Sequence, residues 1–233
     1  MSDESISLNK YISSTGICSR RAADKFIEAK RVKINGKVAI KGNRVLPGDQ
    51  VTLDNNPIGY KPRKIFIMFN KPPGITCTTD RNDPDNIIDF IGHEERIFPI
   101  GRLDKASTGL IFLTNDGDMV NKILRKENKK EKEYIVVVNK PIDKRFVDRM
   151  SRGIPILGTK TLPCEIIKLN KSTFKILLTQ GLNRQIRRMV EYLNYKVVSL
   201  KRVRIMHIQL GNLKEGKWRK LNGTEWNELK NNI

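Results

Sequence analysis

One segment of the sequence, GRLDKASTGLIFLTNDGD at residues 101–118, places a carboxylate where cations dominate. Asp104 lies between Arg102 and Lys105, in a chain with 45 Lys and Arg, 25 Asp and Glu and a formal net charge of +20. That charge favours nucleic acid as the partner, with an anionic membrane surface as the alternative. Because a carboxylate weakens binding to a polyanion, Asp104 is either an ordinary turn residue or a reactive group that could act as a nucleophile.

A second segment, QGLNRQIRRM at residues 180–189, contains cations that could accompany such a group. If Arg187 lay beside a carboxylate, it would keep that carboxylate ionised and orient it. The alternative is that Arg187 binds phosphate together with Arg184 and Arg188 on a basic helix. The residue types alone leave both interpretations open.

Tyr134 lies in a third segment, KEYIV at residues 132–136, which has the composition of a strand. Its ring could stack on a nucleobase, which contributes on the order of 1–3 kcal/mol per base. The alternative is an aromatic side chain packed in the core, and composition alone favours that alternative.

The sequence offers little for metal or cofactor chemistry. His93 and His207 are its only histidines, and Cys18, Cys77 and Cys164 lie far apart. A histidine-based metal site, a serine-type triad and a disulfide framework are therefore poorly supported. No phosphate-binding glycine motif follows an expected strand. We expect chemistry that needs neither a metal nor a cofactor.

Four segments together resemble the motifs of RNA pseudouridine synthases, in the branch that contains RsuA, RluB, RluE and RluF. They are, in order, NKPPGITCT (70–78), GRLDKASTGLIFLTNDG (101–117), KEYIV (132–136) and QGLNRQIRRM (180–189). The last of these most resembles RluF-type enzymes of the large ribosomal subunit. The resemblance covers nearly the whole chain and implies isomerisation of a specific uridine in 23S rRNA.

The resemblance also implies roles for individual residues. Asp104 would be the catalytic carboxylate, acting at ribose C1′ or through a glycal route, and these two routes remain open. Arg187 would pair with Asp104, and Tyr134 would stack on the uracil and assist proton removal at C5. Arg102 would fill the space left by the flipped base or hold a phosphate. Further residues are expected in the site by the same resemblance: Arg184 and Arg188 as RNA contacts, and Lys71, Pro72 and Leu103 in the pocket wall.

The first part of the chain is expected to form a compact unit, residues 5–53. Leu8, Tyr11 and Ile12 share one face of a short helix that ends near Gly16, and Ser19 is a plausible N-cap for a second helix. In that helix we expect the inward positions to be Ala22, Phe26 and Ala29. Asn35-Gly36 indicates a hairpin, followed by a strand at residues 50–53.

This unit resembles the small αL RNA-binding domain named after ribosomal protein S-four. The resemblance implies that Lys10, Arg20 and Arg21 contact structured RNA. Residues 54–64, rich in turn formers, are expected to be a linker.

The remaining residues, 65–233, would form the catalytic domain. Strands are expected at 65–70, 110–114, 133–138, 161–167, 173–178 and 196–202, and helices at 118–126, with Asp118 as N-cap, 144–152 and 183–193. Without regular βαβ alternation this order predicts an α+β fold with a largely antiparallel mixed sheet.

The expected protein is a monomeric enzyme that binds structured RNA. Since no run approaches the roughly 18 apolar residues of a membrane span and no signal peptide is visible, we expect a cytoplasmic location without a membrane. Two alternatives remain. One is the same chemistry on tRNA, alone or in addition. The other is a ribosome-assembly factor whose synthase fold is catalytically dispensable.

Overall fold

A computed structural model describes residues 4–59, 62–124 and 130–233. The chain divides into two compact units, one formed by residues 1–65 and 115–117 and the other by residues 66–114 and 118–233. Each unit has its own core of buried side chains.

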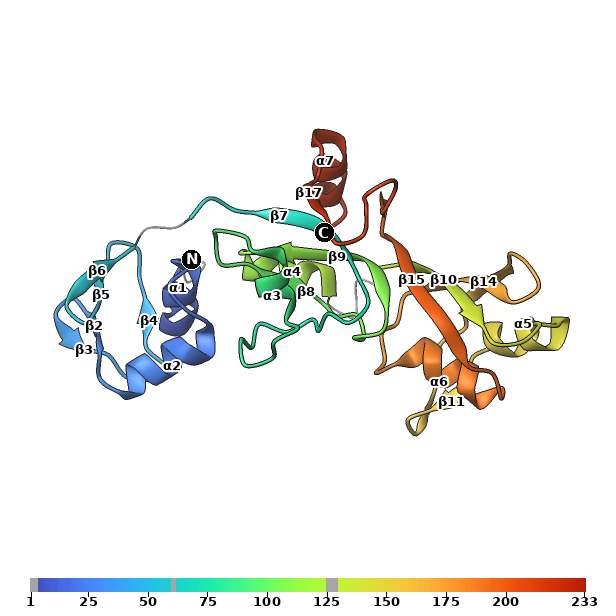
Figure 1. The fold of residues 1–233 in the computed structure, drawn as a ribbon. Helices are drawn as coiled ribbons and strands as arrows, with labels where there is room; N and C mark the ends of the chain where they lie inside the picture. The colour runs from blue at the N-terminus through green and yellow to red at the C-terminus, as the bar shows by residue number, and fades with distance from the viewer. Residues whose placement is uncertain (1–3, 60–61, 125–129) are drawn as a thin grey trace. The chain divides into compact units, whose positions relative to one another are not determined.

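The N-terminal unit packs two helices against short strands (Figure 1). A four-stranded sheet has the order β3-β2-β5-β6, and β1 pairs separately with β4. The bounds are β1 Ile6–Ser7, α1 Leu8–Ser14, α2 Arg20–Glu28, β2 Val32–Ile34, β3 Lys37–Val38, β4 Arg44–Val45, β5 Val51–Leu53 and β6 Asn56–Ile58.

The second helix begins where the sequence predicts, because the Ser19 side chain accepts a hydrogen bond of 3.1 Å from the backbone N–H of Ala22. Its buried residues are Ala23 and Ile27. Of the expected inward residues, Phe26 packs against the core, Ala22 is half-buried and Ala29, at the C-cap, is exposed.

The expected hairpin at Asn35-Gly36 is present, with positive φ at both residues (49° and 78°), the conformation that matches the twist of the strands it joins.

The expected linker is wrong at its start, because Asn56–Ile58 is a strand that pairs with β5. Asp54 and Asn55 both adopt positive φ (51° and 64°), so the chain reverses direction within two residues. Arg31 holds this turn through Nε, which donates to the Asp54 carboxylate at 2.8 Å. The Tyr11 hydroxyl donates to the carbonyl oxygen of Ile58 at 3.2 Å and ties β6 to α1.

The larger unit is built on a nine-stranded sheet. Its main path has the order β13-β14-β10-β15-β9-β7-β17, with β16 beside β15 and β8 beside β9. The bounds are β7 Phe66–Lys71, β8 Phe98–Ile100, β9 Thr108–Thr114, β10 Lys132–Val138, β13 Glu165–Lys168, β14 Thr173–Leu178, β15 Val197–Ile205, β16 Ile208–Gln209 and β17 Trp218–Lys220. A separate hairpin joins β11 Pro155–Ile156 to β12 Thr159–Lys160.

One pairing divides this sheet into two halves. Strands β9 and β15 run parallel, with Thr108 opposite Lys201 and Gly109 opposite Arg202. The other strand pairings described for this sheet are antiparallel. The sheet is therefore mixed and largely antiparallel, and the predicted α+β class is confirmed.

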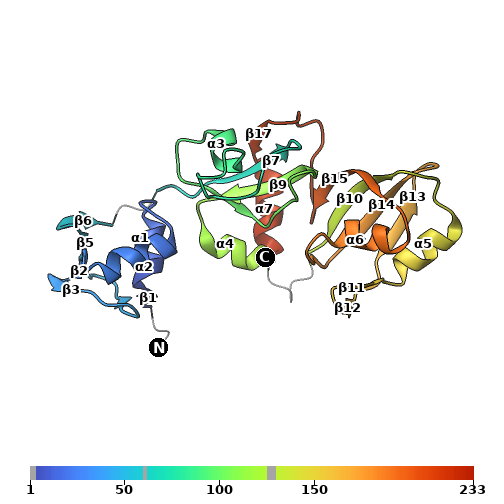
Figure 2. The ribbon, with the colours of Figure 1, turned by 60° about the horizontal axis from the view of Figure 1, so that its bottom comes forward.

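Each half of the sheet has its own helices. Helices α5 (Lys144–Ser151) and α6 (Gln185–Tyr192) pack on β10 and β14 and lie side by side in Figures 1 and 2. Helices α4 (Gly117–Leu124) and α7 (Gly223–Asn231) contribute buried residues to the core under β7 and β9. A short helix, α3 (Ile87–Ile91), brings Phe90 against Phe69.

Two expected elements differ from the structure. Helix α4 begins at Gly117, so Asp118 lies in its first turn rather than at its N-cap, and the expected end at residue 126 lies outside the described residues. The strand expected at residues 161–167 begins only at Glu165. Pro163 has no N–H for a strand ladder, and Thr161 instead accepts a hydrogen bond through Oγ1 from the Ile154 N–H at 2.9 Å.

None of the helices in the described ranges has the length and apolar composition needed to cross a membrane.

Candidate active site

Asp104 lies in the loop between β8 and β9, and the loop is fixed on both sides of it. Leu103 is buried, and its N–H donates to the Cys77 sulfur at 3.4 Å. The carbonyl of Asp104 accepts from the Ser107 N–H at 2.9 Å, which closes a turn. Loop and turn therefore fix the backbone of Asp104 while its side chain remains 30% exposed.

The structure places Arg187 beside Asp104. Arg187 Nε lies 3.5 Å from Asp104 Oδ2, and only 11% of the arginine side chain is exposed. Nη2 of the same guanidinium donates to Ser107 Oγ at 3.1 Å. Helix α6 brings Arg187 there because Ile186, Met189 and Val190 anchor its opposite face in the core. The expected carboxylate–guanidinium pair is thus present, and the buried Ser107 is the second partner of the guanidinium.

Lys71, expected in the pocket wall, supports the same loop from inside. Its side chain is fully buried, and its ammonium donates to the carbonyls of Pro72 at 2.7 Å and of Lys105 at 3.2 Å. Burial lowers the pKa of Lys71, and the nearby Cys77 and Asp104 partly offset this. Lys71 is thus a structural cation that ties the KPPG turn to the residue following Asp104.

Tyr134 lies on β10 in the other half of the sheet, where it is partly buried and packs against the core formed with α5 and α6. It lies opposite Arg202 on β15, and Arg202 lies opposite Gly109 on β9, so the three residues form a row across the strands. The Arg202 guanidinium carbon is 5.9 Å from the centre of the Tyr134 ring. This row connects Tyr134 to the strand that follows the Asp104 loop.

Arg202 is a site residue that the sequence did not reveal. It is 4% exposed, its Nε donates to the Leu110 carbonyl at 2.6 Å, and its buried Nη2 has no hydrogen-bond partner among the described residues. The sequence VSLKRVRI shows only a basic strand, and no spacing in it distinguishes this arginine from Lys201 or Arg204.

Lys132 was also missed. It precedes Tyr134 on the same face of β10, where burial and then the charge of Arg202 lower its pKa to about 8. Burial disfavours the charged form of the Lys132 amine, and the positive charge of Arg202 repels that form further.

The cations expected to bind RNA differ in their surroundings. Arg102 and Arg184 are exposed, and Arg184 adopts a positive φ of 49° at the N-cap of α6. Arg188 turns back on its own helix start and donates to the Asn183 carbonyl at 3.1 Å. Arg188 is therefore partly occupied, whereas Arg102 and Arg184 are directed to solvent.

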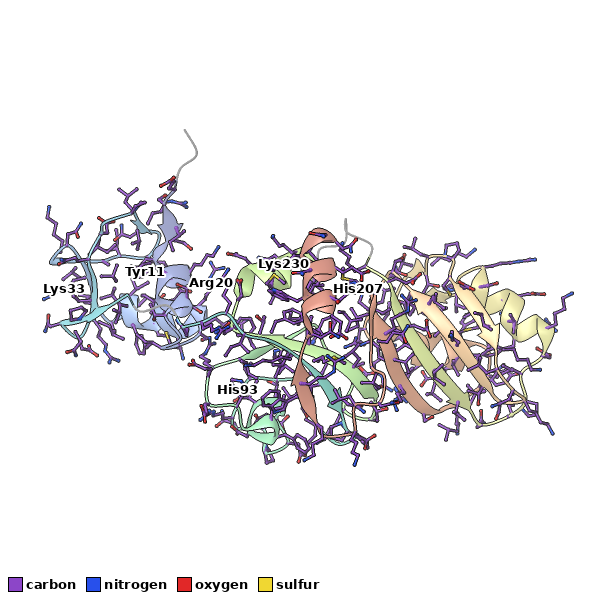
Figure 3. All side chains as sticks on the ribbon, turned by 90° about the horizontal axis from the view of Figure 1, so that it is seen from above. Tyr11, Arg20, Lys33, His93, His207 and Lys230 are labelled. Atoms are coloured by element: carbon purple, nitrogen blue, oxygen red, sulfur yellow. The ribbon has the colours of Figure 1, made fainter. Side chains whose placement is uncertain are left out.

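The three cations of the N-terminal unit that are expected to contact RNA, Lys10, Arg20 and Arg21, lie on its two helices. Arg20 and Arg21 are exposed at the start of α2, and Arg20 Nη2 donates to the Asn9 side chain of α1 at 3.2 Å. Lys10 is half-buried on α1. Lys33 extends from the strand side of the unit, away from Arg20 (Figure 3).

The sequence matches known RNA-modifying proteins along almost its whole length. Residues 65–192 match the RNA pseudouridylate synthase family, and residues 7–51 match the S4 domain. The chain belongs to the RNA pseudouridylate synthase family. The expected family, the RNA-binding N-terminal domain and the isomerase activity are therefore confirmed.

Individual relatives of this synthase agree with that assignment. It is 52% identical over 231 residues to the dual-specificity RNA pseudouridine synthase RluF of Escherichia coli (strain K12), covering 97% of the chain and 79% of the relative. It is 33% identical to the ribosomal large subunit pseudouridine synthase B of Bacillus subtilis (strain 168), covering 96% of the chain and 95% of the relative. A crystal structure of a pseudouridylate synthase superposes with a TM-score of 0.71 at 27% identity, covering 98% of the chain and 100% of that structure.

Proposed function

We propose that this synthase converts a specific uridine of 23S rRNA to pseudouridine, with Asp104 as the catalytic carboxylate. The observation that carries the proposal is the Asp104–Arg187 pair, because it sets a partly exposed carboxylate 3.5 Å from a guanidinium nitrogen at a point where a ribose could approach. The ribosomal RNA substrate is supported by the name of the Bacillus subtilis relative.

The reaction exchanges one bond for another and needs no oxidant or energy source. The bond between ribose C1′ and uracil N1 breaks, the base turns, and a bond forms between C1′ and C5. The proton lost from C5 is balanced by a proton gained at N1. Asp104 either bonds to C1′ or acts through a glycal, and in both routes the ionised carboxylate is the reacting group.

Other residues receive supporting roles in this proposal. The ring of Tyr134, with Arg202 behind it, stacks on the uracil, and its hydroxyl takes part in proton removal at C5. Arg102 occupies the place of the flipped base or holds the backbone next to it. Lys10, Arg20 and Arg21 bind phosphates of structured RNA through the helices of the S4 domain.

A second substrate class, tRNA, is proposed as an alternative or an addition. The name of the Escherichia coli relative calls that enzyme dual-specificity. A purely non-catalytic assembly role is disfavoured, because the acid, the paired arginine and the tyrosine are all present.

The decisive experiment maps pseudouridine by carbodiimide tagging in rRNA and tRNA from cells with and without the gene. Complementation with Asp104→Asn should restore no modification, because the amide is neither charged nor nucleophilic, while RNA binding stays near the wild-type level. Asp118→Asn is the matched control, since it changes another acid of the same segment in the first turn of α4 and should restore full modification. Turnover by Asp104→Asn at the wild-type rate would exclude Asp104 as the reacting group.

A further inference from the structure

Helix α5 presents a basic face that none of the roles above uses. Lys144, Arg145, Arg149 and Arg152 are exposed and, with Asp148, line a surface depression of about 450 Å³. The opposite face of the helix is fixed in the core by Phe146 and Met150. The four cations therefore point outward together from a rigid element.

The requirements of the fold favour Arg149 and Arg152, which lie at the C-terminal end of α5, but do not explain Lys144 and Arg145. Lys144 and Arg145 occupy the first two positions of α5, where the helix dipole disfavours positive charge. With the described residues, Lys144, Arg145 and Arg152 form no side-chain hydrogen bond or ion pair. Lys144 and Arg145 therefore oppose their own helix without an ion pair, which is consistent with an external anion.

The α5 face contacts helix α6, the helix that also carries Arg187. Arg149 lies over the ring of Tyr192 at 5.6 Å, and Tyr192 is 47% exposed at the far end of α6. Arg187, at the near end, is paired with Asp104. The distance along the helix from Arg187 to Tyr192 is only about 8 Å at a rise of 1.5 Å per residue.

We propose that the α5 face binds phosphates of the RNA helix that flanks the target uridine. The proposal rests on the RNA substrate of the proposed function and extends it to a contact surface. The stripe from Arg145 to Arg152 is about 10 Å long at 1.5 Å per residue, and a nucleic acid duplex carries one charge about every 3 Å of axis on each strand. The stripe therefore spans more than one phosphate.

An RNA flank fits this surface better than an acidic protein. Arg149 contacts the helix that also carries Arg187, and Tyr192 beside Arg149 offers a partly exposed ring at which an unpaired base can stack. Arginine pairs with phosphate through two parallel hydrogen bonds, which suits a backbone of any sequence.

The test is the double variant Lys144→Glu with Arg145→Glu in the full-length protein. Affinity for total large-subunit rRNA from cells lacking the gene should fall at least tenfold at physiological salt. The slope of log Kd against log salt should fall by about 2, because two phosphate contacts are lost. The melting temperature should not fall, since glutamate suits the first turn of a helix.

The matched control is Lys220→Glu with Lys230→Glu, which changes the net charge equally at the opposite edge of the sheet. Lys220 lies on β17 and Lys230 on α7 (Figure 3). The control should bind rRNA within about twofold of the wild type. If rRNA binding weakens equally in both double variants, the effect is one of net charge alone and the proposal is overturned. If the α5 variant binds rRNA as tightly as the wild type, the proposal is also overturned.

Single-turnover assays separate this inference from the proposed function. If the wild type forms no pseudouridine in rRNA or tRNA, the proposed function fails. If the wild type forms it and the α5 variant has an unchanged KM, the inference alone fails. On a short hairpin that contains the mapped uridine but lacks its flank, the wild type and the α5 variant should have equal KM, and a persisting difference would contradict a contact with the flank.

Discussion

Replacement of Gly109 by alanine tests whether the seam between β9 and β15 holds the active site together. Gly109 has a φ of 101°, and a Cβ at this position would lie 2.2 Å from the carbonyl oxygen of Arg202 and 2.8 Å from its nitrogen. Both atoms are backbone, so no side-chain rotation can relieve the clash. The two strands must therefore move apart along the pairing that joins the two halves of the sheet.

The cost has two parts. An alanine held at an unfavourable positive φ costs about 1–3 kcal/mol, and overpacking costs about another 1–3 kcal/mol. The sum, about 2–6 kcal/mol, is a large fraction of the 5–15 kcal/mol that stabilises an ordinary domain. At about 2–4 °C per kcal/mol for a domain of this size, the melting temperature should fall by roughly 5–20 °C.

The rate of pseudouridine formation by Gly109→Ala should fall even at temperatures where the variant is still folded. The seam positions the Asp104 loop relative to Tyr134, and a displacement near 1 Å can cost on the order of 10²-fold in rate. Circular dichroism melting gives the stability, and carbodiimide detection of product below the melting transition gives the rate. Gly223→Ala is the control, because a Cβ there meets nothing within 4 Å at the start of α7. A Gly109→Ala protein that melts within 2 °C of the wild type and keeps its rate would refute this account of the seam.

Three further outcomes are expected. Arg187→Met should lower kcat by roughly 10²-fold with little change in KM, and Arg187→Lys should recover part of the rate because it keeps the charge. Arg20→Ala with Arg21→Ala should weaken rRNA binding and reduce its salt slope by about 2. In the folded chain the pKa of Lys132 is about 8, below its ordinary 10.5, so between these values the unfolded chain binds the extra proton and stability rises with pH. The melting temperature of the wild type should therefore rise relative to that of Lys132→Met from pH 7 to pH 10.

Each expectation has a result that contradicts it. A Met variant at position 187 with full kcat would make the ion pair with Asp104 dispensable. A salt slope that is unchanged by loss of Arg20 and Arg21 would remove the S4 helices from phosphate binding. A constant difference in melting temperature across the pH range would show that Lys132 titrates as it does in the unfolded chain.

The resemblance to the synthase motifs predicted the pair of Asp104 and Arg187 that the structure brings together, whereas the residue types alone left the partner of Arg187 open. Local turn chemistry predicted the hairpin at Asn35-Gly36 and the cap at Ser19, since both depend on neighbouring residues alone. Arg202 could not be found in this way, because its burial depends on pairing with Gly109, which is far away in the chain.

Strand β6 and helix α7 were not predicted, and the physical cause differs between them. Strand β6 follows Asp54-Asn55, where two non-glycine residues adopt positive φ because Arg31 and β5 stabilise the turn. Sequence pattern alone gives such a pair a lower weight than Asn-Gly. In helix α7 the apolar and polar side chains are poorly separated into two faces, so periodicity does not reveal the helix. Its capping box, formed by Asn222 and Glu225, is the stronger sequence signal for a helix.

The parallel pairing of β9 with β15 also affects the order in which the two units fold during synthesis. Strand β15 lies near the end of the chain, and contacts between distant segments form late because closing a long loop is entropically costly. The helices of the S4 domain need only neighbouring residues, and they leave the ribosome first. During synthesis we therefore expect the S4 domain to fold before Asp104 and Arg187 are brought together in the larger unit.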